Sequence, residues 1–130
     1  MQTTETKYPR GVVEEAAAVR SASKPCFIKD GRALLRIIKH QVVYLSADGH
    51  VCNLFLSTHR APLVLSSSFS SIAAKLSDVL TLVRRGTAVN LQYASAIKEG
   101  SIYIESPHHN LDIAYTQDNY ENILSSINVL

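Results

Sequence analysis

The chain has 130 residues, with 13 basic and 11 acidic side chains and a formal net charge of +2 at pH 7. This length favours one domain, and a content of 46% hydrophobic and 18% charged residues is typical of a packed core. No apolar run approaches the roughly 20 residues of a membrane-spanning helix, and the first residues do not resemble a secretory signal. Two cysteines, Cys26 and Cys52, make no disulfide framework, so we expect reduced thiols and a cytoplasmic protein.

Charge is unevenly distributed along the chain. Residues 31–104 carry eight basic and three acidic side chains, whereas residues 105–130 carry four acidic side chains and no lysine or arginine. A basic region attracts polyanions such as nucleic acid, and an acidic region restricts where they can lie. The middle of the chain is therefore the part most suited to bind a polyanion.

The first 25 residues differ in pattern from the rest. Residues 1–10 are polar and show no periodicity, which is typical of an arm. The segment from Val12 to Arg20 is rich in alanine and glutamate and has valines at helical spacing, so it predicts a short helix followed by a linker. We expect a tether or an interface at residues 1–25 and one domain at residues 26–130.

From Cys26 onward the pattern has a period of two, which predicts β-strands. The dipeptides Asp30-Gly31 and Asp48-Gly49 predict tight hairpin turns, because glycine supplies the positive φ that such turns require. Pro62 cannot donate to a ladder, which favours an edge position for its strand. The predicted strands cover residues 27–28, 33–38, 41–46, 50–57, 61–65, 79–83, 88–91, 94–97, 101–105 and 111–115.

Two short helices complete the prediction. Ser68 is a suitable N-cap for a helix whose apolar residues recur at helical spacing from Phe69 to Leu76. A second amphipathic helix is predicted from about Gln117, with Thr116 as its N-cap. The chain is therefore expected to be mainly β, with a short central helix and a C-terminal helix.

The sequence contains no recognisable catalytic motif, so we expect no enzyme activity. His108 and His109 are adjacent, and adjacent extended residues point in opposite directions, so a hydrated loop is favoured over a metal site. Cys52 lies between apolar neighbours in a predicted strand, where a buried and inert thiol is the ordinary case. No cofactor and no metal are expected.

Two features are suited to bind an anion. Arg84 and Arg85 end an apolar strand at Gly86, and their guanidinium groups can fork onto phosphates or onto the O6 and N7 atoms of guanine. A solvated strand end is the simpler alternative. The predicted helix start at Thr116 and Gln117 offers free N–H groups to an anion, and Gln117 can also pair with adenine, whereas the alternative there is a well-capped helix.

Three segments, in the same order, resemble the LytTR family of bacterial DNA-binding domains. The segment from Phe27 to Ile37 resembles the opening hairpin of that family, and Val42 to His50 resembles its hallmark strand and Asp-Gly turn. The segment from Leu80 to Leu91 resembles the family signature that is commonly written phenylalanine, any residue, arginine, valine, histidine, arginine, serine, tyrosine, leucine, valine, asparagine. The resemblance covers about residues 26–128.

The resemblance implies an elongated fold of three antiparallel β-sheets whose loops enter successive major grooves of double-stranded DNA, often at direct repeats. Family members regulate transcription, usually as response regulators of two-component systems. A homodimer on DNA and an upstream signalling partner are therefore implied, although residues 1–25 contain no receiver domain. Carried over by position, the DNA contacts fall at His50, Arg84, Arg85, Tyr115, Thr116 and Gln117.

The contact positions depart from the family pattern. Leu82 stands where arginine is frequent, Arg84 replaces the usual histidine, and no arginine lies near Tyr115. The sequence predicts a sequence-specific DNA-binding transcriptional regulator with altered contacts. One alternative is a non-enzymatic interaction module that uses the strand edge at Ala61–Leu65 or the N-terminal helix. A second is a sensor whose cysteines or histidines control DNA binding.

Overall fold

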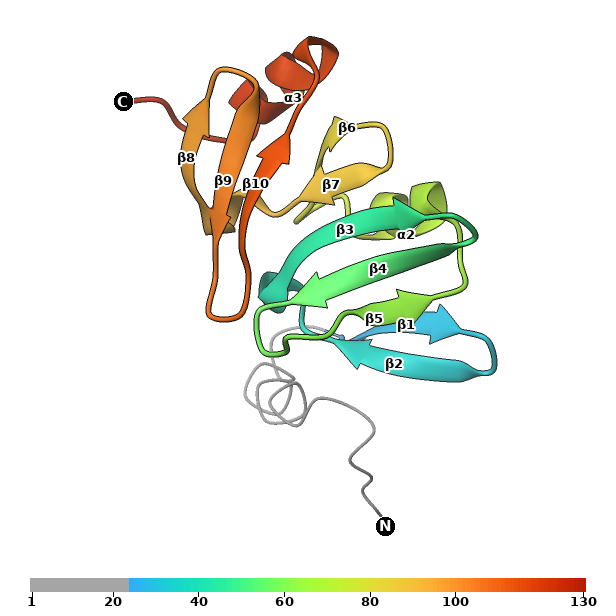
Figure 1. Cartoon of the computed structure of the whole chain (residues 1–130). Coiled ribbons are helices and arrows are strands. Elements are labelled where there is room, and N and C mark those ends of the chain that lie inside the picture. The colour runs from blue at the N-terminus through green and yellow to red at the C-terminus, as the bar shows by residue number, and fades with distance from the viewer. Residues whose placement is uncertain (1–23) are drawn as a thin grey trace.

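The structure is a computed structural model that describes residues 24–130, so the helix expected at residues 12–20 lies outside the described part of the chain. In this part, ten strands form three antiparallel sheets, accompanied by two α-helices and three 3₁₀ turns (Figure 1). No helix of residues 24–130 is long and apolar enough to cross a membrane.

Sheet A is a hairpin of β1 (Cys26–Asp30) and β2 (Ala33–Ile37). Its two-residue turn contains Gly31 at φ 63°, which confirms the turn predicted from the Asp-Gly dipeptide. One face of the hairpin buries Ile28 and Leu35, because residues alternate across the sheet.

Sheet B has five strands in the order β5-β4-β3-β7-β6. β5 lies at an edge, as Pro62 predicts, and it begins only after the proline. The turn between β3 and β4 contains Gly49 at φ 63°, again as expected from Asp-Gly. The strands are β3 (Val42–Asp48), β4 (Val51–Leu56), β5 (Leu63–Leu65), β6 (Thr81–Arg84) and β7 (Thr87–Val89).

Sheet C has three strands in the order β10-β9-β8. The 3₁₀ turn η1 (Lys39–Gln41) leads from sheet A into sheet B, and η2 (Leu91–Tyr93) leads from sheet B into sheet C. Neither turn was predicted, because three residues are too few to show a helical period. The strands of sheet C are β8 (Ala94–Lys98), β9 (Ser101–Glu105) and β10 (Asn110–Ala114).

The two faces of sheet B are covered by two separate hydrophobic cores. The first core joins sheet B to sheet A and to α2 (Phe69–Lys75), and the second joins it to sheet C and to α3 (Tyr120–Ser125). The three sheets therefore follow one another in the order A, B, C, as the resemblance implies (Figure 1). The first core includes Ile28, Leu35, Leu45, Leu54, Leu65 and Ile72, and the second includes Val43, Val83, Val89, Ile102, Ile104, Ile113 and Ile123.

The central helix begins as predicted, and the C-terminal helical segment also begins at Gln117, but with a 3₁₀ turn and without a side-chain cap. The Ser68 hydroxyl accepts a hydrogen bond from the backbone N–H of Ser71 at 3.2 Å, which is an N-cap interaction. By contrast, the residues after Thr116 form a 3₁₀ turn, η3 (Gln117–Asn119), and α3 begins only at Tyr120. Thr116 makes no side-chain cap because its hydroxyl accepts a hydrogen bond from the Asn119 amide at 2.8 Å.

The histidine pair is a second correction. His108 is exposed, as expected for a hydrated loop, but His109 is buried with 7% of its surface exposed. Its Nε2 lies 2.8 Å from the carbonyl oxygen of His59 and 3.0 Å from that of Leu56. Both oxygens are acceptors, so Nε2 must carry the proton and is shared between them. His109 thus connects the β9–β10 loop to the end of β4.

Candidate nucleic-acid interface

Three connections of the chain meet along one side of the molecule. The backbone N–H of Ala47 donates to the carbonyl of Gly86 at 2.9 Å, which ties the end of β3, next to the β3–β4 turn, to the β6–β7 turn. The N–H of Thr116 donates to the carbonyl of Val83 at 3.0 Å, which ties the end of β10 to β6. We call these connections, residues 48–51, 84–87 and 115–117, the turn edge (Figure 1).

Arg84 and Arg85 are the most prominent cations of the turn edge. Arg84 ends β6, and Arg85 with Gly86 forms the two-residue turn into β7. Both side chains are exposed, and neither forms an ion pair or a hydrogen bond with another described residue. Gly86 has φ 76°, a conformation that side chains with a Cβ rarely adopt, so the glycine fixes the shape of this turn.

His50 occupies the neighbouring turn between β3 and β4. It is exposed and follows Gly49 directly, with the exposed carboxylate of Asp48 beside it in sequence. The bond from Ala47 to Gly86 holds this turn against the one that carries Arg85. The structure therefore brings together the histidine and the arginines that the sequence predicts as contacts.

Tyr115, in the third connection, uses its side chain for contacts within the protein. Its hydroxyl donates to the carbonyl of Lys98 at 2.9 Å, and its ring stacks on Tyr120 with 5.8 Å between the centroids. The side chain is half-buried by these contacts. Tyr115 is thus engaged within the protein, whereas Thr116 and Gln117 are exposed on the surface.

The helix end beyond Thr116 differs from the anion site that the sequence predicts. A 3₁₀ turn replaces the first α-helical turn, and α3 has only six residues, so few N–H groups point the same way. Asp118 lies in η3 and Glu121 in the first turn of α3. Two carboxylates at this position oppose a phosphate group, because like charges repel.

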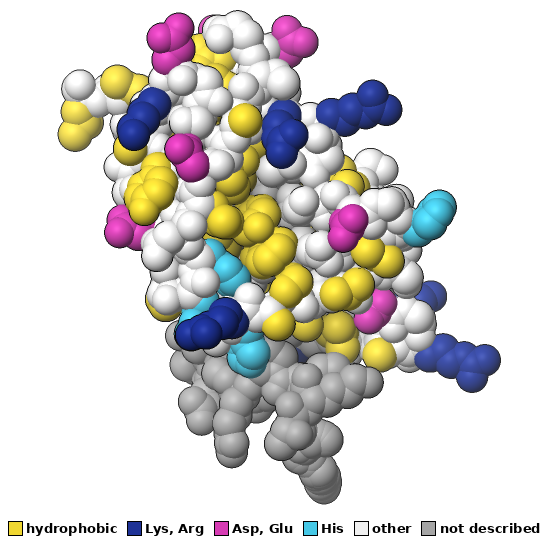
Figure 2. All heavy atoms as spheres, in the orientation of Figure 1, with side chains coloured by type: hydrophobic (Ala, Val, Ile, Leu, Met, Phe, Trp, Pro, Cys, Tyr) yellow, Lys and Arg dark blue, Asp and Glu magenta, His cyan; other side chains and the backbone are white. Residues whose placement is uncertain are grey.

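Sheet A contributes further cations that the sequence prediction did not single out. The β1–β2 turn points to the same side as the β3–β4 turn (Figure 1), and both Lys29 and Arg32 are exposed there. Basic residues on both sides of the Asp30-Gly31 turn are the signal that could have identified them. Figure 2 shows dark blue and cyan side chains projecting along this side with magenta ones among them, and further magenta ones over sheet C and α3.

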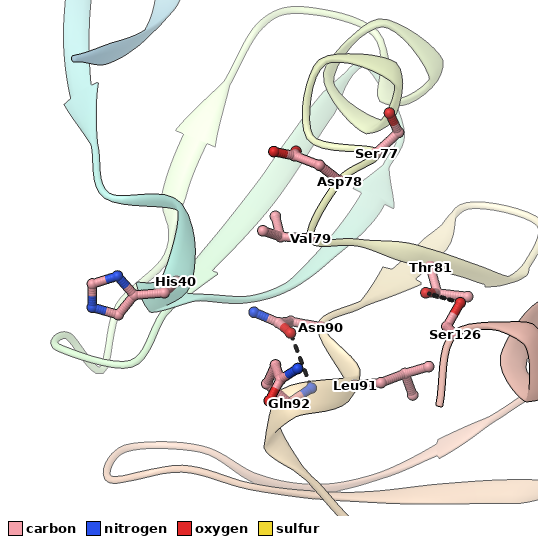
Figure 3. Close-up of a pocket in the computed structure, with 9 residues that line it drawn as sticks. All are labelled: His40, Ser77, Asp78, Val79, Thr81, Asn90, Leu91, Gln92 and Ser126. Atoms are coloured by element: carbon pink, nitrogen blue, oxygen red, sulfur yellow. Dashed lines mark hydrogen bonds between the residues drawn. The ribbon is translucent and has the colours of Figure 1, made fainter. Parts of the chain in front are cut away.

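A polar pocket of about 330 Å³ lies between η1, the α2–β6 connection, η2 and the end of α3 (Figure 3). At its rim, the Lys39 ammonium donates to the Asp78 carboxylate at 2.8 Å. This hydrogen bond lowers the pKa of Asp78 and raises that of Lys39. None of the six predicted contacts lines the pocket, whose residues are His40, Ser77, Asp78, Val79, Thr81, Asn90, Leu91, Gln92 and Ser126.

The described residues contain little that fits the sensor alternative. Cys52 is buried, as predicted, and its Sγ donates to the Ser67 carbonyl at 3.3 Å. Burial raises the pKa of the Cys52 thiol, which disfavours the reactive thiolate. No group of three or more potential metal ligands is found within residues 24–130.

Comparison with known proteins identifies the fold. No protein-family model and no curated protein matches the chain. Among solved structures, the chain is similar to the LytTr DNA-binding domain of a methyl-accepting/DNA response regulator from Bacillus cereus, with a TM-score of 0.56 and 13% sequence identity. The match covers 81% of this chain and 97% of that domain. The chain therefore has a LytTR-type fold, as the three sequence segments predict.

Proposed function

We propose that this chain binds double-stranded DNA in a sequence-dependent manner through its turn edge and thereby regulates transcription. The observation that carries the proposal is the pair of free guanidinium groups, Arg84 and Arg85, on a turn that projects from a rigid sheet. The LytTR-type fold supports it, because the matching Bacillus cereus domain is described as DNA-binding.

The β6–β7 turn is the proposed reading element. A two-residue hairpin turn is narrow enough to enter the major groove, which is about 12 Å wide. Arg85 lies in the turn and is proposed to reach a base edge, preferably guanine, which accepts a bidentate guanidinium at O6 and N7. Arg84 ends the strand one residue earlier and is proposed to hold a phosphate.

The neighbouring turns are proposed to extend the contact along the duplex. His50 in the β3–β4 turn is held beside the arginine turn and supplies a second contact. Lys29 and Arg32 on the β1–β2 hairpin suit phosphate contacts farther along. Each neutralised phosphate releases counterions, so binding should weaken steeply as salt rises.

The third connection is proposed to contribute less than the resemblance implies. Asp118 and Glu121 place negative charge at the start of the C-terminal helix. Tyr115 is proposed as a positioning residue, since its hydroxyl and ring are both engaged within the protein. Thr116 and Gln117 remain candidates for one base or phosphate contact at the end of the interface.

The proposal is tested by selecting binding sites from a random duplex library at low salt. The full chain is compared with an Arg84→Ala, Arg85→Ala double variant and with Arg60→Ala, which removes an exposed cation from the β4–β5 loop. We expect one enriched motif for the wild type and for Arg60→Ala, and none for the double variant. A motif with two copies in the same direction would additionally support binding to direct repeats.

The single variant Arg85→Ala separates base readout from phosphate contact. If Arg85 reads a base, the selected site should bind about 1–3 kcal/mol more weakly and the preference at one position should relax. An equal loss on all sequences would reassign Arg85 to the phosphate backbone. The proposal of sequence-dependent binding is wrong if the wild type enriches no motif at low salt.

A further inference from the structure

The hairpin of sheet A has an outer face with apolar and basic side chains. Ile28 and Leu35 point into the first core, so the residues next to them in each strand point away from it. Phe27 faces Arg36 across the hairpin, and Lys29 faces Leu34. Phe27 is 47% exposed and Leu34 65% exposed, and the Arg36 guanidinium lies 5.4 Å from the centre of the Phe27 ring.

Sheet C has an outer face of the opposite charge. Ile102, Ile104 and Ile113 point into the second core, so the alternate residues of β9 and β10 point outward. Tyr103 faces Asp112 across the two strands, and Glu105 faces Asn110. All four of these side chains are exposed.

These two outer faces lie at opposite ends of the molecule. Sheet A packs on one face of sheet B through the first core, and sheet C packs on the other face through the second core. Figure 2 shows dark blue side chains beside the β1–β2 hairpin and magenta ones over β9 and β10, together with a dark blue side chain over the upper part of sheet C and magenta ones on the hairpin side. The sheet A face presents the Phe27 ring with Lys29 and Arg36. The sheet C face presents the Tyr103 ring with Glu105 and Asp112, and also the exposed Lys98, which pairs with Ser101 across β8 and β9. The net charges of these two sets are opposite.

We infer that the outer face of sheet A in one copy of the chain docks on the outer face of sheet C in a second copy. Lys29 and Arg36 would meet Glu105 and Asp112, while the Phe27 and Tyr103 rings bury their exposed surface. Two identical faces do not pair, because each would bring like charges together. The contact is therefore heterologous, and it lines up successive copies head to tail.

The contact is expected to be weak and sensitive to salt. Each face contributes one aromatic ring and a few charged side chains, fewer than the roughly 20–30 residues that each partner contributes to a stable specific interface. Exposed ion pairs are screened by salt, with a Debye length of about 10 Å at 0.1 M. The inference does not rest on DNA binding, because it uses no residue of the turn edge, and among its residues only Lys29 is also proposed as a phosphate contact.

The inference is tested by sedimentation equilibrium of the full chain at low salt, without DNA. One variant reverses the charges on the outer face of sheet A (Lys29→Glu, Arg36→Glu). Another reverses the acidic charges on the outer face of sheet C (Glu105→Lys, Asp112→Lys). Wild-type protein should associate reversibly at high concentration. Each variant alone should bind itself at least about tenfold more weakly, because every contact then joins like charges.

Two combinations distinguish this contact from general charge effects. An equimolar mixture of the two variants should associate again, and so should the protein that carries all four changes, because unlike charges then face each other. Arg60→Glu changes the net charge without touching either face and should behave as the wild type. A wild type that stays monomeric at all concentrations, or variants that associate as well as wild type, would overturn the inference.

Discussion

At the scale of single residues, one buried amide organises the passage from sheet B to sheet C. Asn90 is 3% exposed, and its Nδ2 donates to the carbonyl of Val42 at 2.8 Å. Its Oδ1 accepts from the backbone N–H of Gln92 at 3.0 Å. The backbone N–H of Asn90 donates to the carbonyl of Val43 at 2.8 Å. The side chain thus provides a hydrogen-bond donor for the Val42 carbonyl in sheet B and an acceptor for the Gln92 N–H in η2.

Replacing Asn90 by alanine is expected to lower the free energy of unfolding by about 2 kcal/mol, because it leaves the buried carbonyl of Val42 and the partly buried N–H of Gln92 without these partners. Urea denaturation measures the change, with Asn110→Ala, at an exposed position, as the control. Asn90→Asp should be at least as damaging at neutral pH and should recover as the pH falls, since a protonated carboxyl can again donate. Equal stability of Asn90→Ala and wild type would contradict this role.

At the scale of elements, the central helix depends on its cap. Ser68→Ala is expected to lower the free energy of unfolding by about 1 kcal/mol, because the N–H of Ser71 loses its acceptor. Ser70→Ala is a matched control within the same short helix, since Ser70 is exposed. Thermal or urea denaturation of the two variants should differ, and an equal effect would show that the cap contributes nothing.

Elements with a local cause were predictable from the sequence. The Asp-Gly turns, the edge strand after Pro62 and the Ser68 cap each follow from the conformational or hydrogen-bonding limits of one or two residues. The missing side-chain cap at Thr116 and the 3₁₀ form of the turn that follows were not, because Thr116 bonds to the side chain of Asn119 instead of capping the backbone.

The candidate site also has features that the sequence could predict and features that it could not. Exposed arginines next to a glycine turn are recognisable in the sequence, and Arg84 and Arg85 are indeed exposed. The internal role of Tyr115 could not be foreseen, because its partner Lys98 lies 17 residues away in the chain. The burial of His109 depends on carbonyl groups 50 and 53 residues away.

At the scale of the whole molecule, His109 fastens sheet C to sheet B. Its Nε2 donates to the carbonyl oxygens of Leu56, at the end of β4, and of His59, in the following loop, and its ring makes a T-shaped contact with Phe55 with 5.5 Å between the centroids. The N–H is present in the neutral ring, so the link does not require a charged histidine. This link lies on the β9–β10 loop, at the other end of these strands from Tyr115.

His109→Ala is expected to lower the free energy of unfolding by about 2 kcal/mol, since both carbonyl groups lose a donor. Amide hydrogen exchange should speed up in β9 and β10 before it does in sheet A. His108→Ala, at the exposed neighbouring position, is the matched control. Uniform acceleration across all three sheets would show that His109 supports global stability and not this junction.

The two backbone hydrogen bonds at the turn edge have a thermodynamic consequence. They join Ala47 to Gly86 and Thr116 to Val83, so the three connections are held in place by the folded protein itself. A ligand at this edge meets groups whose backbone entropy was already lost during folding. Calorimetry of binding should therefore give a heat-capacity change that reflects the contact area alone, without the large negative contribution of a segment that folds on binding.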